Sequence, residues 1–139
     1  MFVDSQLMFS DAQALTTTAV STNDIDLSSD RNIGKGEPMA VVVTFGADSG
    51  GTSPTLQVVL LTDNDVAFGS STTMASSAVV LSAKAGDSIV LPIGYENERY
   101  LRLNYVTGGT TPTATVDAYL QPMSMIDGKD DLPNGYTIV

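Results

Sequence analysis

The chain has 139 residues, enough for one domain that buries roughly two-thirds of the surface of its unfolded form. Sixteen acidic residues against six basic ones give a formal net charge of -10, which disfavours direct binding to nucleic acid or anionic membranes. The sequence contains no His and no Cys, which excludes His-based general acid–base catalysis, thiol nucleophiles, structural zinc and disulfides.

The N-terminal sequence MFVDSQLMFSDAQ carries acidic residues early and has no basic segment followed by an apolar core. It therefore does not resemble a signal peptide, and no run approaches the roughly 18 apolar residues that cross a bilayer. We expect a soluble protein made in the cytoplasm. Residues 1–12 are predicted to form an N-terminal arm, and its apolar Phe2 and Leu7 are candidates for packing on the domain or on a partner.

Short segments rich in Val, Thr, Leu and Tyr follow, separated by clusters of Gly, Pro, Asp and Ser. This pattern is typical of an all-β sandwich or barrel, and we predict an eight-stranded, jelly-roll-like antiparallel β-sandwich as the core over residues 13–122. No internal repeat is evident. The predicted strands are Ala14–Ser21, Ile25–Leu27, Pro38–Phe45, Thr55–Thr62, Thr73–Ala83, Ser88–Ile93, Arg99–Val106 and Thr113–Gln121.

Two predicted strands, MAVVVTF and TLQVVLL, are almost continuously apolar, which indicates that both of their faces are covered by a second sheet or another subunit. The segment Ser88–Gly94 alternates instead, with Pro92 on the face opposite Ile89. Because proline cannot donate a ladder hydrogen bond, an edge position or a bulge is expected there.

Paired carboxylates occur at Asp24-Ile-Asp26 and Asp63-Asn-Asp65, and three acids cluster in residues 127–131. None has the spacing of a calcium-binding loop, so capping of loops by Asp and Asn is the preferred interpretation. A glycosidase would need a second carboxylate of defined position, and none can be named. We predict no catalytic residue, no cofactor and no metal site.

The segment ENERYLRLNYVTGGTTPTATVDAYLQP predicts a hairpin around a turn at Thr107–Pro112. A symmetric register places Leu101, Leu103 and Tyr105 on the core face. On the outer face it pairs Arg102 with Asp117 as an ion pair and Tyr100 with Tyr119, beside Asn104. Two interpretations stay open for this outer patch, an ordinary solvated sheet face or a protein contact surface, since Tyr and Arg are enriched at interfaces.

The C-terminal sequence MSMIDGKDDLPNGYTIV, residues 123–139, is predicted to be a second arm, with Tyr136 as a candidate contact residue. A tail meant only to be solvated would lack such aromatic and apolar residues. The whole chain, 1–139, is therefore interpreted as one β-sandwich domain with two extended arms.

Taken together, MFVDSQLMFSDAQALTTTAVSTNDIDL, IGKGEPMAVVVTF and NERYLRLNYVTGGTTPTATVDAYL resemble the capsid cement, or decoration, proteins of short-tailed bacteriophage heads. The resemblance spans nearly the whole chain and is weakest over the last dozen residues. It implies a jelly-roll subunit on the outer surface of the capsid, made in the bacterial host cytoplasm. Such a subunit bridges neighbouring major capsid proteins and resists internal DNA pressure.

The resemblance also implies two partners, the major capsid protein and a second copy of the chain in a homodimer, and the net charge leads us to expect no nucleic acid and no membrane as partners. The outer face of the predicted hairpin or the MAVVVTF edge is expected to form the self-association surface, and the two arms are expected to contact the capsid. The alternative is a carbohydrate-binding or host-recognition sandwich of a tail or fibre.

Overall fold

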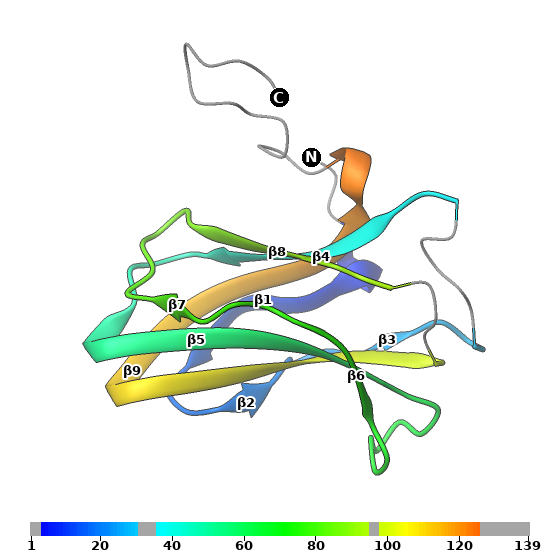
Figure 1. Cartoon of the computed structure of the whole chain (residues 1–139), viewed down its shortest axis with the longest axis horizontal. Coiled ribbons are helices and arrows are strands. Elements are labelled where there is room, and N and C mark those ends of the chain that lie inside the picture. Colours follow the sequence, from blue (N-terminus) through cyan, green and yellow to red (C-terminus); the bar gives the residue numbers. More distant parts are fainter. Residues whose placement is uncertain (1–3, 31–35, 95–97, 126–139) are drawn as a thin grey trace.

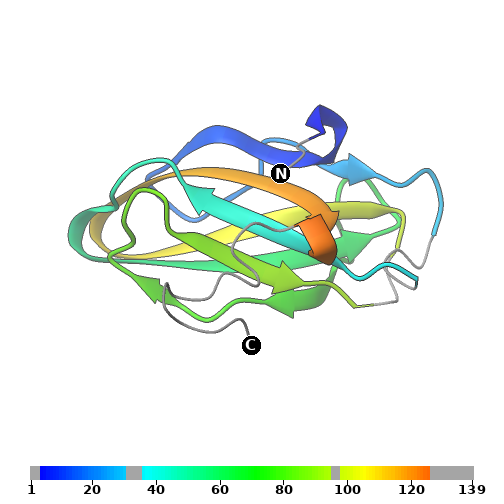
Figure 2. The same cartoon turned by 90° about the horizontal axis from the view of Figure 1, so that it is seen from above.

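The computed structural model describes residues 4–30, 36–94 and 98–125, and these form two antiparallel sheets packed face to face (Figures 1 and 2). The predicted all-β sandwich is confirmed, and its sheets nearly close into a barrel. The described strands are β1 (Met8–Leu15), β2 (Ala19–Val20), β3 (Ile25–Asp26), β4 (Met39–Phe45), β5 (Gly50–Asp63), β6 (Thr72–Ser76), β7 (Val80–Leu81), β8 (Ser88–Pro92) and β9 (Tyr100–Pro122), with short 3-10 turns η1 (Ser5–Leu7) and η2 (Met123–Met125).

Strand β9 belongs to both sheets, because its two halves pair with different neighbours. In sheet A, the C-terminal half of β9 lies between β1 and β4, and β4 also pairs with β8. In sheet B, the N-terminal half lies between β5 and the short strands β2 and β3, while β5 also pairs with β6 and β7. Figure 1 shows β9 crossing from its yellow half in sheet B to its orange half in sheet A.

The predicted hairpin is wrong: β9 is one continuous strand of 23 residues, and the segment read as a turn is a bend within it. Gly109 has φ +100 and Thr111 has φ +47, so the chain does use the left-handed backbone that suggested a turn. The two halves of β9 do not pair with each other; each half pairs with strands from elsewhere in the chain.

The bend is held by a second bend of nearly the same sequence in β5. Residues 50–55 read GGTSPT and residues 108–113 read GGTTPT, and the two segments pair antiparallel with Gly50 opposite Thr113 and Thr55 opposite Gly108. Gly51 has φ +101, and a Cβ there would lie 2.5 Å from the carbonyl oxygen of Thr111. At Gly109 it would lie 2.5 Å from that of Ser53. A short internal repeat is therefore present, contrary to the sequence-based expectation.

The two sheets repeat one arrangement around these paired bends. Residues 50–63 of β5 can be aligned with residues 108–121 of β9. The N-terminal half of β9 pairs with the first segment as β4 pairs with the second, in the same register and with core residues at the same positions. In sheet A, the core residues Val41, Val43 and Phe45 of β4 lie opposite Leu120, Ala118 and Val116 of β9. In sheet B, the core residues Leu101, Leu103 and Tyr105 of β9 lie opposite Thr62, Leu60 and Val58 of β5. The sandwich has an approximate internal two-fold symmetry.

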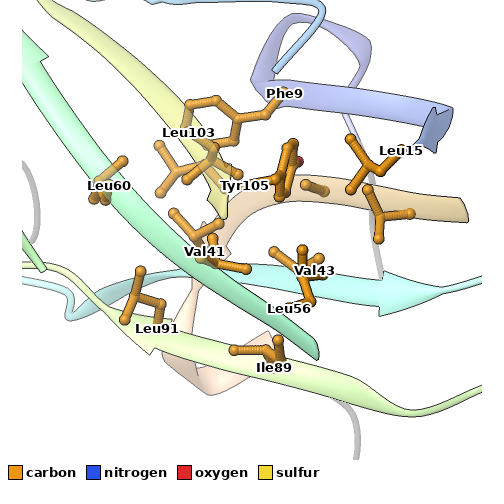
Figure 3. Packing of buried hydrophobic residues seen from close by; sticks show 14 of the residues in the cluster. Phe9, Leu15, Val41, Val43, Leu56, Leu60, Ile89, Leu91, Leu103 and Tyr105 are labelled. Carbon is orange, nitrogen blue, oxygen red and sulfur yellow. The ribbon is translucent and has the colours of Figure 1, made fainter. Parts of the chain in front are cut away.

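The core lies between the sheets, with side chains from β1, β4, β5, β8 and β9 pointing toward one another (Figure 3). Phe9 and Tyr105 are fully buried within it. The hydroxyl of Tyr105 is satisfied by the Oγ of Ser10 at 2.7 Å, and burial raises the pKa of Tyr105. This pair joins β1 to the middle of β9 across the core.

Sheet A begins at Met8, so β1 starts inside the segment predicted as the N-terminal arm. The MAVVVTF strand, β4, has both faces covered, but it lies between β8 and β9 and offers no free edge for self-association. Strand β8 pairs only with β4 among the described residues, which confirms the edge position expected from Pro92. No helix in residues 4–30, 36–94 and 98–125 is long and apolar enough to cross a membrane.

Gly109→Ala should lower the free energy of unfolding by about 2 kcal/mol or more, because a Cβ would adopt a left-handed φ and also meet backbone oxygens of β5. Gly86→Ala is the matched control, since Gly86 has φ +90 but nothing lies within 4 Å of the added Cβ. Urea unfolding of both variants measures the difference. Equal losses would show that the close approach of β5 and β9 does not contribute.

Candidate functional site

The outer side of sheet B carries the residues that the sequence pattern placed on the first half of the predicted hairpin. Successive side chains of a strand point to opposite faces, so Tyr100, Arg102 and Asn104 face outward between three fully buried core positions. Neighbouring strands add aliphatic side chains on the same side. This surface, face B, comprises Val20, Gln57, Val59, Leu61, Tyr100, Arg102, Asn104 and Val106.

Arg102 is fixed in the middle of face B by a carboxylate and an aromatic ring. Its Nε and Nη2 donate to the two carboxylate oxygens of Asp24 at 2.7 and 2.6 Å, and its guanidinium lies 4.0 Å from the centroid of the Phe68 ring. The hydrogen bonds that Arg102 donates to Asp24 raise the pKa of Arg102. Because both side chains are only 21% and 22% exposed, the pair holds the segment before β3 against β9.

A second arginine–aspartate ion pair, Arg99 with Asp26, is more exposed than the pair of Arg102 with Asp24. Arg99 donates from Nε and Nη2 to Asp26 at 2.8 and 2.9 Å, and its guanidinium lies 4.8 Å from the Tyr100 ring centroid. Arg99 and the backbone N–H of Ser28 lower the pKa of Asp26 to about 2. The ionised Asp26 therefore stabilises the fold above its ordinary pKa of 3.8, and this contribution is lost as the pH falls toward 2.

The predicted Arg102–Asp117 ion pair is wrong, because the two residues lie on different sheets. Asp117 lies on the part of β9 in sheet A, where its Oδ1 accepts from the backbone N–H of Ala12 at 2.7 Å. Tyr119 also lies in sheet A, on its outer side, and is only 5% exposed. The predicted patch thus separates into two parts: Tyr100, Arg102 and Asn104 lie on the outer side of sheet B, whereas Asp117 and Tyr119 lie on sheet A.

The remaining candidate contact residues lie elsewhere. Leu7 is partly buried and packs against the main core, so the described part of the chain accounts for its apolar character. Phe2 and Tyr136 lie outside the described residues.

The carboxylate pairs tested as calcium ligands have other partners. Asp24 and Asp26 each hold an arginine, whereas Asp63 accepts from the backbone N–H groups of Asp65 and Ser70, which lower its pKa. Over residues 4–30, 36–94 and 98–125, no group of three or more His, Cys, Asp or Glu could hold a metal ion. The loop-capping interpretation of Asp63 and Asp65 is confirmed.

Face B has the physical character of a protein-binding surface. Aliphatic, tyrosine and arginine side chains lie together on one side of sheet B, and Arg102 is already held in one orientation, which reduces the entropy lost on binding. Sequence reasoning missed the aliphatic part, because TLQVVLL was taken as uniformly buried. Its outward positions, Gln57, Val59 and Leu61, could have been found by applying a two-residue period from Leu56.

Comparison with known proteins identifies one family. The model of the family described as Bbp16 matches residues 9–120, which includes every strand except the first residue of β1 and the last two of β9. No curated protein matches the sequence.

Arg102→Lys should destabilise the protein by about 1 kcal/mol, because an ammonium cannot reproduce the two-pronged contact with Asp24 or stack on Phe68. Arg99→Lys is the matched control, and its loss should be smaller because the Arg99–Asp26 pair is more exposed. Chemical denaturation of both variants tests the order. A larger loss of stability for Arg99→Lys would contradict the conclusion that the Arg102–Asp24 pair stabilises the fold more than the Arg99–Asp26 pair.

Proposed function

Because the chain belongs to the Bbp16 family, a phage-related protein family, we propose that it is a capsid cement protein of a phage head. In this role it binds the outer surface of the assembled head and clamps neighbouring major capsid proteins together, which stabilises the shell against the pressure of packaged DNA. The chain acts through contact surfaces and not through catalysis.

The observation that carries this proposal is the composition of face B. Tyrosine and arginine contribute large contact area at low entropic cost, and they are the residue types enriched among interface hot spots. Tyr100 and Arg102 are accompanied by Val20 and Val106, which are 45% and 37% exposed. Burial of these valines against a partner would add hydrophobic stabilisation that the isolated chain does not obtain.

The charge distribution is compatible with a position on the outside of a DNA-filled shell. With a formal charge of -10, the chain is repelled by nucleic acid, so we do not expect it to bind the packaged DNA. Arg99 and Arg102 are neutralised by Asp26 and Asp24. They therefore provide shape and hydrogen-bonding direction rather than a net positive patch.

Binding to a lattice makes modest contacts sufficient. A shell presents many equivalent sites, and a homodimer of the chain would engage two of them at once, so that the second contact forms at high effective concentration. We assign face B as the surface that contacts the major capsid protein. The strand β4 is interior to sheet A and is not used for self-association through its edge.

Val106→Asp and Val20→Asp should each weaken binding to isolated heads at least tenfold, or by about 1.4 kcal/mol, because a charge would be buried in the contact. Val79→Asp is the matched control, since Val79 is 59% exposed and lies outside face B. Co-sedimentation of the purified protein with heads that lack it measures occupancy at each concentration.

Equal occupancy of all three variants would remove face B from the capsid contact. Binding to glycans on an array, with no binding of the unmodified protein to heads, would instead support the carbohydrate-binding or host-recognition function.

A further inference from the structure

Asp63 is an acidic residue that the fold buries at the end of the outward-facing row of β5. Val59 and Leu61 precede it on the outer side of sheet B, and it lies opposite Tyr100 of β9. Asp63 is only 5% exposed. Because a buried carboxylate needs hydrogen bonds or opposite charges in place of water, the groups that donate to Asp63 identify its structural role.

The carboxylate of Asp63 closes the loop that joins β5 to β6. Its Oδ1 accepts from the backbone N–H of Asp65 at 2.9 Å, and its Oδ2 accepts from the backbone N–H of Ser70 at 2.9 Å. These two bonds join both ends of the segment 64–70 to one side chain. In Figure 1 the loop lies on the side of sheet B away from sheet A. Asp63 therefore fixes the path of the chain on the outer side of sheet B.

Phe68 is the residue of this loop that contacts face B. Its φ is +53, in the left-handed region that a bulky side chain rarely adopts. In this conformation its ring centroid lies 4.0 Å from the guanidinium of Arg102. A strained backbone persists only where surrounding contacts fix it. The two bonds to Asp63 are such contacts, together with the bond from the N–H of Phe68 to the carbonyl of Asp65 at 2.9 Å.

Phe68 gives Arg102 a second contact in addition to Asp24. Asp24 accepts from Nε and Nη2 of Arg102, whereas the Phe68 ring lies against the central carbon of the guanidinium. Such a cation–π contact is stronger where water is partly excluded, and the Arg102 side chain is only 21% exposed. Phe68 is itself only partly buried, so it also adds accessible surface beside Arg102.

We propose that Asp63 is a positioning residue for face B, which holds the loop 64–70 so that Phe68 joins Arg102 in the contact surface. The proposal rests on the proposed function of face B. A protein partner then meets an aromatic ring and a guanidinium that are already fixed in place, which limits the entropy lost on binding. Asp63 acts through Phe68 and does not touch the partner, because it is buried.

Asp63→Asn tests the positioning role, because an amide has one acceptor oxygen and cannot accept from both Asp65 and Ser70. Asp65→Asn is the matched control, since it makes the same change of charge in the same loop. The bond that Asp65 Oδ1 accepts from the N–H of Ala67 can be kept by an amide oxygen.

Proton NMR of the full chain follows the Phe68 ring, because an aromatic ring shifts the signals of protons that lie over it. Phe68→Gly gives the Arg102 side-chain signal without the ring, and glycine adopts a positive φ without strain. Asp63→Asn should move this signal most of the way to the Phe68→Gly value, whereas Asp65→Asn should leave it unchanged. An unchanged signal in Asp63→Asn would overturn the positioning role. Asp63→Ser repeats the comparison if Asp63→Asn does not fold.

Co-sedimentation with isolated heads tests the contact itself. Phe68→Gly should weaken binding about tenfold, and Asp63→Asn should weaken it too. Asp65→Asn and Phe68→Tyr, which keeps the ring, should retain binding. Unchanged binding of Phe68→Gly, or equal losses for Asp63→Asn and Asp65→Asn, would overturn the proposal. If the unmodified chain does not bind heads, the proposed function fails, and the NMR comparison alone decides whether Asp63 positions Phe68.

Discussion

The close antiparallel contact between the two Gly-Gly bends is the constraint on which the sandwich depends. Gly51 and Gly109 let β5 and β9 approach until backbone oxygens of one strand occupy the space that a Cβ of the other would need. Two long strands can then turn together, and β9 can leave sheet B and enter sheet A without a loop. Both sheets, the core between them and the orientation of each outer face follow from this crossing.

The approximate two-fold symmetry is confined to the interior. Phe45 and Tyr105 occupy equivalent core positions, but the equivalent outward positions hold Val42 on sheet A and Arg102 on sheet B. Packing requires the same volume in both halves, whereas the outer faces are free to differ. The difference gives one outer face of buried, mainly apolar residues and another that presents tyrosine, arginine and exposed valines. A single domain thereby gains two unlike surfaces from one repeated framework.

Several strands could be predicted from the sequence because their two-residue period and their breakers are local signals, whereas the predicted strand Ala14–Ser21 is wrong, since it spans the end of β1, a bend and β2. The ends of β4 and β8 were placed within one residue, and the alternation around Arg102 was correct. The crossing could not be predicted, because Gly-Gly with a following Pro is equally typical of a hairpin turn and of a bend. Pairing then depends on residues far apart in the chain.

That one error determined which part of the site was missed. Folding β9 back on itself assigned Asp117 to Arg102, whereas Asp24, from a segment 78 residues away, is the actual partner. The repeat GGTSPT and GGTTPT was the available signal, since two matching bends indicate that strands pair with each other across the repeat. The residues that β2 and β5 contribute to face B can be identified only once that pairing is known.

A cryo-electron map of intact phage heads would show whether face B of this Bbp16-family chain binds the outside of the capsid. We expect density for the sandwich on the outer shell, with Tyr100, Arg102 and Val106 against the major capsid protein. Absence of the chain from the head, or attachment through another face while face B remains open to solvent, would contradict it.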